Sequence, residues 1–225
     1  MTAPVVFAGP SLDQASRRQL SGVELLAPVA RGDIDSLFAR AQPPKLVGIV
    51  DGVFLQSLAI SPKEILAAMD NHEAIFFGSS SIGALRAAEL ADFGMRGVGT
   101  IFEMFRSGEV NADDEVAITF DPETLTAISE PMVNIRVAIA AAVTAGIISA
   151  ETAASAITAA KRRYFPDRTY RLLLHDITDQ VEPQDLSALR AYLAGDAPNA
   201  KQDDALALVA AMRAAATPNG STGQK

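Results

Sequence analysis

The sequence predicts an α/β fold, a doubly wound and mostly parallel Rossmann-like sheet followed by a helical C-terminal region. Short runs that are apolar throughout alternate with helical segments in the first half, which is typical of parallel strands covered on both faces. With 225 residues and 49% hydrophobic content, the chain can bury a substantial core. We expect a sheet domain over residues 1–120, a mainly helical region packed on it over 121–216, and a disordered tail over 217–225.

Four apolar runs are the expected strands, and three of them end directly before a glycine or an Asp-Gly pair. The clearest helix start lies between the third and fourth runs. There Ser61 suits the N-cap, Pro62 the first helical position and Glu64 the capping box. Another helix is expected over Ile82–Ala91. The four runs are Val5–Ala8, Val23–Val29, Leu46–Val50 and Ala74–Phe77.

After Asp92 the pattern changes, and helices dominate from about Val133 onward. Val98–Arg106 has a helical pattern, whereas Val116–Phe120 is strand-like. Three later segments have strong helical signals, two of them rich in alanine. They are Val133–Ala145, Ala150–Arg163 and Asp203–Ala215.

Composition excludes several classes of site and partner. Without cysteine there is no disulfide, thiolate metal site or cysteine nucleophile, and two histidines are too few for a histidine-rich metal site. We assign no metal ligands and expect no cofactor. A net charge of −8 argues against nucleic acid as a partner. No run approaches the roughly 18–20 apolar residues of a membrane span, and the start has no basic segment, so we expect a cytoplasmic protein that binds no membrane.

Ligands of doubly wound sheets bind where the strands end, and three loops fall on that edge. They are Gly9-Pro10-Ser11, Asp51-Gly52 and Gly78-Ser79-Ser80-Ser81. The third loop opens a helix, whose first amides favour negative charge and offer a ready oxyanion site. Its spacing misses the Gly-x-Ser-x-Gly nucleophile elbow by one residue. Two plainer readings stay open, a serine that only caps the helix and a loop that binds an anion without a nucleophile.

A nucleophilic serine needs a base, and neither histidine suits that role. His72 precedes the strand that carries the serine loop and so lies at the wrong end of the sheet, and His175 lies in a helical stretch. Asp51 ends the neighbouring apolar run on the correct edge and is the natural base. The alternative is an Asx turn between Asp51 and Gly52.

Three further polar groups could be functional or structural. Arg86 could orient an anionic group or simply pair with Glu89 one turn away. Asp113-Asp114-Glu115 could act as an acid/base pair or hold a hard cation, although most acidic triplets are solvated loops. The third group comprises Glu130, Asn134 and Arg136. These residues lie around an expected helix start at Pro131, so helix capping could account for much of this polar pattern.

Taken together, these segments resemble the TfuA family over roughly Leu46–Tyr164, and Val5–Ser11 fits the family's beginning. The sequence departs mildly from the family pattern at two positions, with Ser79 where alanine is usual and Ile82 where methionine is usual. The matching strings are Ile49-Val50-Asp51-Gly52-Val53-Phe54, Gly78 through Leu90, Gly94-Met95, Gly97-Val98-Gly99, Ile101-Phe102, Asp113 through Ala117 and Glu130 through Arg136.

The resemblance implies a partner of YcaO enzymes, which use ATP to turn peptide backbone amides into thioamides. It implies delivery of sulfur by hydrolysis of the C-terminal thiocarboxylate of a ThiS-like carrier, and the precursor peptide is a possible further partner. A chain without cysteine cannot carry a persulfide, which suits this acyl route. Two other functions stay open, a non-catalytic adaptor that docks the carrier or YcaO, and a small-molecule esterase or anion-binding protein.

On this hypothesis Ser80 is the nucleophile or carbonyl-binding group and Asp51 is the base. Arg86 orients the terminal group of the carrier, and Asp114 or Glu115 assists. The remaining polar and glycine positions are the expected substrate contacts. They are Gly9, Pro10, Ser11, Gly52, Gly78, Ser79, Ser81, Glu130, Asn134 and Arg136.

Overall fold

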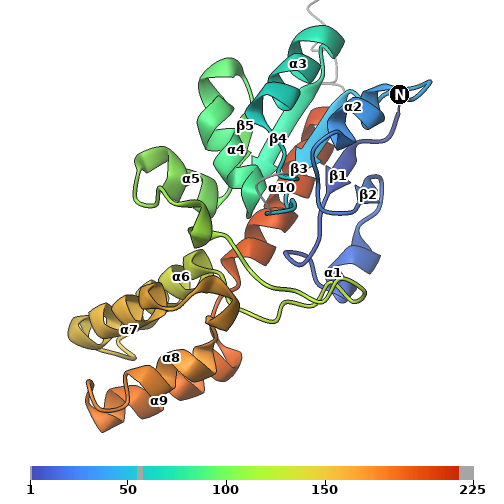
Figure 1. The fold of residues 1–225 in the computed structure, drawn as a ribbon. Coiled ribbons are helices and arrows are strands. Elements are labelled where there is room, and N and C mark those ends of the chain that lie inside the picture. The colour runs from blue at the N-terminus through green and yellow to red at the C-terminus, as the bar shows by residue number, and fades with distance from the viewer. Residues whose placement is uncertain (1, 55–57, 218–225) are drawn as a thin grey trace, which may run out of the picture.

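The computed structural model, which describes residues 2–54 and 58–217, contains a five-stranded sheet in which every pair of neighbours is parallel (Figure 1). The strand order β2-β1-β3-β4-β5 confirms the predicted doubly wound architecture. Because the chain moves outward from β1 to β2 and then returns to β3, the topological switch point lies between β1 and β3. The strands are β1 (Val5–Phe7), β2 (Glu24–Leu26), β3 (Leu46–Ile49), β4 (Ile75–Ser79) and β5 (Arg96–Val98).

Four strands lie where the apolar runs predicted them, and two segments differ. β5 was missed because it is a short edge strand of three residues, Arg96-Gly97-Val98, with little hydrophobic signal. The strand predicted over Val116–Phe120 is wrong. This segment is irregular apart from one isolated bridge between Phe120 and Ala127, and its side chains line a cavity instead of joining the sheet.

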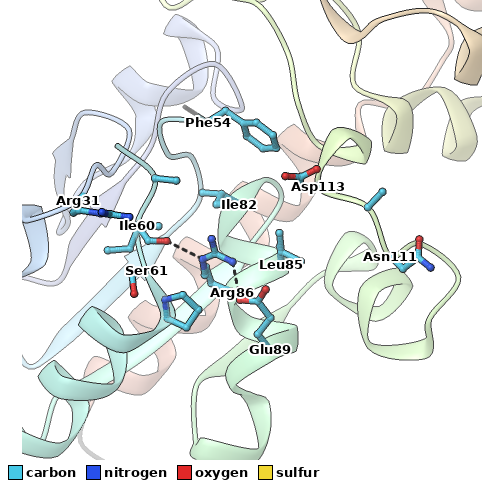
Figure 2. A pocket seen from close by; sticks show the side chains of 13 residues that line it. Arg31, Phe54, Ile60, Ser61, Ile82, Leu85, Arg86, Glu89, Asn111 and Asp113 are labelled. Atoms are coloured by element: carbon cyan, nitrogen blue, oxygen red, sulfur yellow. Dashed lines mark hydrogen bonds and ion pairs between the residues drawn. The ribbon is translucent and has the colours of Figure 1, made fainter. Parts of the chain in front are cut away.

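Helix α3 (Pro62–His72) begins with the predicted capping box. The Ser61 hydroxyl accepts from the Lys63 amide, and the Glu64 carboxylate accepts from the Ser61 amide. The loop before α3 is tied to α4 (Ile82–Leu90), because Arg86 Nε donates to the Ile60 carbonyl at 3.0 Å (Figure 2). Helices α3 and α4 are therefore fixed relative to each other on one side of the sheet.

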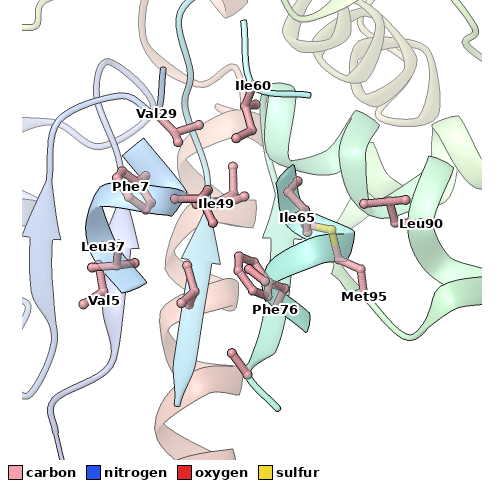
Figure 3. Close-up of a cluster of buried hydrophobic side chains, with 14 of the residues drawn as sticks. Val5, Phe7, Val29, Leu37, Ile49, Ile60, Ile65, Phe76, Leu90 and Met95 are labelled. Atoms are coloured by element: carbon pink, nitrogen blue, oxygen red, sulfur yellow. The ribbon is translucent and has the colours of Figure 1, made fainter. Parts of the chain in front are cut away.

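The core divides between the two faces of the sheet, as strand alternation requires. Val5 and Phe7 of β1 point toward α2 (Asp33–Phe38), α3 and α4, where Phe76 and Ile65 complete the cluster (Figure 3). Val6 between them points to the opposite face. There α10 (Ala200–Ala216) crosses the sheet, packing an apolar stripe that comprises Ala205, Leu208, Val209 and Met212.

Helix α4 lies very close to the sheet because two glycines allow it. A Cβ on Gly83 would stand 1.8 Å from the Ile49 carbonyl oxygen, and one on Gly78 would stand 2.2 Å from the Gly83 oxygen. The Gly83 amide also donates to the Val50 carbonyl at 3.2 Å. Both glycines of the serine loop therefore serve backbone packing, which fixes the start of α4 against β3 and β4.

The helical region projects from one end of the sheet as the yellow and orange helices in Figure 1 and has its own core. The chain then returns through α10 to the sheet. Of the predicted disordered tail, residues 218–225 lie outside the described residues. None of the helices within residues 2–54 and 58–217 combines the length and apolarity needed to cross a membrane. The remaining helices are α1 (Gln14–Gln19), α5 (Thr100–Ser107), α6 (Met132–Thr144), α7 (Ala150–Arg162), α8 (Tyr170–Asp176) and α9 (Pro183–Gly195).

Candidate functional site

Asp51 lies at the switch point and joins the loops that follow β1 and β3. Its Oδ2 accepts from the amides of Gly9 at 2.7 Å and Ser11 at 3.0 Å, and its Oδ1 accepts from the Ser11 hydroxyl at 2.6 Å. The carboxylate is therefore rigidly held, with only 3% of the residue exposed. These bonds run across the sheet edge, so the side chain is not used in an Asx turn with Gly52.

The first turn of α10 brings a buried lysine to the same place. Nζ of Lys201 lies 2.9 Å from Ser81 Oγ and 3.2 Å from the Val116 carbonyl oxygen. It lies 3.8 Å from Asp51 Oδ1, which is an ion pair without a direct hydrogen bond. An amine, a hydroxyl and a carboxylate thus meet at the carboxyl ends of the strands.

Burial lowers the pKa of Lys201 below its ordinary value of 10.5, because the interior disfavours the ammonium form. The negative charges of Asp51 and Glu130 act in the opposite direction but do not cancel the effect of burial. A lysine with a lowered pKa can hold its amine neutral and accept a proton at moderate pH. Lys201 is therefore a candidate base in contact with a serine hydroxyl.

The main chain of Lys201 is held from both sides. Its amide donates to Asn134 Oδ1 at 3.0 Å, and its carbonyl accepts from Ser80 Oγ at 2.8 Å. Asn134 in turn donates to Asn199 Oδ1 at 3.0 Å. Ser80 and Asn134, both predicted from sequence, thus lie at the site as supports of the lysine.

The three serines of the loop have different surroundings. Ser80 has a φ of 66°, which suits a tight turn from strand to helix, and it is fully buried. Ser79 is fully buried too, and its hydroxyl has no hydrogen-bond partner among the residues described. Ser81 is the N-cap residue of α4, yet its side chain makes no capping bond. The capping interpretation is therefore wrong, and Ser81, not Ser80, contacts the amine.

A cavity of about 290 Å³, called here the switch-point pocket, opens beside these groups. Asp51, Ser81 and Lys201 provide its polar end, together with Pro10 and Gly52 from the predicted loops. The remaining wall is mostly apolar, so a ligand there would meet few competing hydrogen-bonding groups. Its wall residues are Pro28, Val53, Phe54, Val116, Ala117, Ile118, Thr119, Phe120 and Phe165.

Two residues of the acidic triplet, Asp114 and Glu115, belong to an ion-pair cluster with Arg136, Lys161 and Arg168, whereas Asp113 lines a separate cavity. Each carboxylate oxygen of Asp114 and Glu115 has a cationic partner between 2.7 and 3.0 Å away. Burial alone would raise the pKa values of both carboxyls, but these hydrogen bonds and charges outweigh it and lower them. Neither side chain lines the switch-point pocket.

The predicted group near Pro131 divides between these two clusters. Arg136 pairs with Glu115, whereas Asn134 holds Lys201. Pro131 is itself the N-cap residue of α6, so Glu130 does not cap the helix. Burial raises the pKa of Glu130, although its hydrogen bond with Asn134 and the charge of Lys201 act against that shift.

Arg86 faces a different cavity of about 560 Å³, called here the lateral cavity. Its pairing with Glu89, predicted from the spacing, is confirmed at 2.7 Å. Phe54 lines both cavities and stands between them. The structure therefore places Arg86 outside the switch-point pocket, in a cavity that shares Phe54 with it.

Lys201 is the residue of this candidate site that the sequence did not predict, because the last helix was predicted to begin at Asp203. It begins at Ala200 instead. Lys201 lies one turn before Ala205 on the same face of the helix as Ala205 and Leu208, which form its apolar stripe. A lysine on the buried face of a helix is the signal that could have found it.

Comparison with protein families gives a match over the middle of the chain. The sequence model of the family described as TfuA-like protein matches residues 51–169, which is more than half of the chain. The matched region contains Asp51 and the serine loop, but it ends before Lys201. No curated protein matches the chain.

Proposed function

Because the chain belongs to the TfuA-like family, we propose that it hydrolyses the C-terminal thiocarboxylate of a ThiS-type sulfur carrier and releases sulfide. The family is consistent with an accessory role beside YcaO, and the sulfide would supply YcaO-dependent peptide thioamidation. The observation that carries the chemistry is the contact of 2.9 Å between Ser81 Oγ and Lys201 Nζ at the polar end of an apolar pocket.

In the first step, neutral Lys201 takes the proton of the Ser81 hydroxyl as Oγ attacks the thiocarboxylate carbon. The C–S bond then breaks, and Lys201 returns the proton to the departing sulfur. The products are an acyl ester on Ser81 and hydrosulfide. The first amides of α4 favour the negative charge that develops on the reacting group.

In the second step, Lys201 takes a proton from water, whose oxygen attacks the acyl carbon. The ester bond breaks and the proton returns to Ser81 Oγ. The carrier leaves with an ordinary carboxylate, so the sum of both steps is thiocarboxylate plus water giving carboxylate, hydrosulfide and a proton. No oxidant or reductant is required.

Asp51 supports this cycle from its fixed position. Its charge favours the ammonium form of Lys201 at 3.8 Å, while burial favours the neutral form. These opposed effects suit a group that must both take and release a proton. The sequence-based hypothesis gave the base to Asp51, and we now assign that role to Lys201 and an electrostatic role to Asp51.

Two serine variants test the proposal. Ser81→Ala removes the proposed nucleophile, and we expect release of sulfide from purified thiocarboxylated carrier to fall on the order of 10³-fold or more. Ser80→Ala is the matched control, since it removes a neighbouring hydroxyl that donates to the main-chain carbonyl of Lys201. Ser80→Ala should lower the rate of sulfide release by only about tenfold, as expected for the loss of one neutral hydrogen bond.

The result would contradict the proposal if Ser80→Ala were the more damaging change or if Ser81→Ala kept the wild-type rate. Carrier binding should be measured for the same variants. Wild-type protein that binds the carrier but releases no sulfide would favour the adaptor function instead. Turnover of simple esters without carrier turnover would favour a small-molecule esterase.

A further inference from the structure

The lateral cavity is larger than the switch-point pocket and has a more polar lining. Figure 2 shows Arg86 between Ile60 and Glu89, with Asn111 and Asp113 on the opposite side. These groups come from α4, from the loop before α3 and from the segment that follows α5. None of them is used in the chemistry proposed above.

The two cavities adjoin each other along the start of α4. Ser81 lines the switch-point pocket, and the next residue, Ile82, lines the lateral cavity. Phe54 contributes to both and lies 6.4 Å from the ring of Phe165. A ligand that extends from the lateral cavity past Phe54 would therefore reach the pocket that Ser81 lines.

Arg86 is prepared to bind such a ligand. Its side chain is only 13% exposed and is fixed by Nε donating to Ile60 and Nη1 donating to Glu89. Nη2 donates no hydrogen bond within the described part of the chain, and Figure 2 shows the guanidinium facing the open middle of the cavity. A held guanidinium with unused N–H groups is suited to carbonyl oxygens.

The two cavities differ in volume, so they can hold different parts of a substrate. The switch-point pocket has a volume of about 290 Å³ and mostly apolar walls, so it admits only the end of a peptide chain. A folded protein that presents its C-terminal acyl group must place the preceding residues elsewhere. The lateral cavity, at about 560 Å³, is the adjoining space.

We propose that the lateral cavity binds the extended peptide segment that precedes the reacting C-terminal group, with Arg86 donating to its main-chain carbonyls. This inference rests on the proposed function and adds a subsite for the tail of a macromolecular substrate. Glu89 and Asn111 offer acceptors for main-chain amides of the same segment. The expected substrate is therefore a protein with an extended C-terminus, not a free small acid.

The experiment compares two thiocarboxylates, the carrier and thioacetate, which lacks a peptide tail. Arg86→Ala should lower the ratio of kcat/KM for the carrier to kcat/KM for thioacetate by about 10- to 100-fold, the loss expected for hydrogen bonds from a charged group. The change should appear mainly in KM for the carrier. Ala112→Trp, which fills the cavity from its opposite side, should lower the ratio in the same way.

Arg106→Ala is the matched control, because Arg106 also pairs with a carboxylate, Asp92 at 2.9 Å, but does not line the lateral cavity. It should leave the ratio unchanged. Equal losses with both substrates, or an unchanged ratio in Arg86→Ala, would overturn the subsite.

Binding of the unmodified carrier gives a readout that does not depend on turnover. We expect its Kd to rise about 10- to 100-fold in Arg86→Ala and in Ala112→Trp. If wild-type protein hydrolyses neither substrate, the proposed function fails, while this binding shift still supports the subsite. If turnover proceeds but the Kd is unchanged in both variants, the subsite fails and the hydrolase remains.

Discussion

Two groups of buried or half-buried charges lie close together in this molecule and differ in what surrounds them. In the ion-pair cluster, every oxygen of Asp114 and Glu115 has a cationic partner within 3.0 Å. At the switch point, Lys201 is 3.8 Å from its carboxylate and 2.9 Å from a hydroxyl that lines a cavity. The first arrangement satisfies its carboxylates internally, whereas the second leaves an amine and a hydroxyl beside a space for a ligand.

The pKa shifts express the same difference. Those of Asp114 and Glu115 are lowered, so the folded state favours their charged forms. The pKa of Lys201 is also lowered, but for an amine this means that the folded state disfavours the charged form. A charge that the fold stabilises indicates a structural role, and a charge that it destabilises beside a cavity indicates chemistry.

The largest expected effect is on the rate of sulfide release, and it should differ between variants of two lysines. Lys201→Met should reduce sulfide release by about 10²–10⁴-fold, because the proposed base is lost. The variant must stay folded for this comparison, because it also removes the donor to the Val116 carbonyl and the counter-charge of the buried Asp51. Sulfide release and thermal unfolding are measured on the same preparation.

Lys161→Met is the matched variant in the ion-pair cluster, where Lys161 bridges Asp114 and Glu115. It should lower the unfolding temperature but keep kcat. If Lys161→Met abolished turnover while Lys201→Met kept it, the comparison of the two clusters would be reversed.

The next effect is on stability. Glu115→Gln should lower the free energy of unfolding by about 1–3 kcal/mol, because Arg136 and Lys161 lose their shared acceptor. The folded pKa of Glu115 is lowered from 4.5, so its stabilisation is present above that value and is lost as pH falls through the folded pKa. Denaturant unfolding at pH 7 should therefore show the difference, and measurements below the folded pKa should not.

The smallest effect is a shift in the pH dependence of the rate. The rate should rise with pH as Lys201 loses its proton. Because Asp51 raises the pKa of Lys201, Asp51→Asn should move this rise to lower pH, by about one pH unit for roughly 1.4 kcal/mol of lost interaction. The profile of kcat/KM against pH measures the shift, and a rise that stays in place would show that Lys201 is not the titrating base.

Much of the fold was predictable because its signals are local. The apolar runs of β1, β3 and β4 and the capping box at Ser61 can each be recognised within a few consecutive residues. β5 was missed because three residues at a sheet edge need little hydrophobicity. Val116–Phe120 misled the prediction because apolar residues that line a cavity have the same pattern as a buried strand.

The site was less predictable because it depends on the orientation of side chains and on residues that are far apart in the sequence. Topology placed the three loops on one edge, and the hydrogen bonds from Gly9 and Ser11 to Asp51 show that they meet. Sequence could not distinguish Ser80 from Ser81, since only the turn geometry decides which hydroxyl faces the pocket. Lys201 lies 120 residues after Ser81, so no local pattern connects them.

The origin of Lys201 in α10 determines when the site of each new chain is complete. During synthesis the strands β1 to β5 and the serine loop leave the ribosome long before residue 201 does. Until α10 follows and packs across the sheet, the hydroxyl of Ser81 has no amine beside it. A nascent chain therefore lacks the proposed base, and cleavage by a protease before α10 would leave a fragment with a serine loop and no lysine beside it.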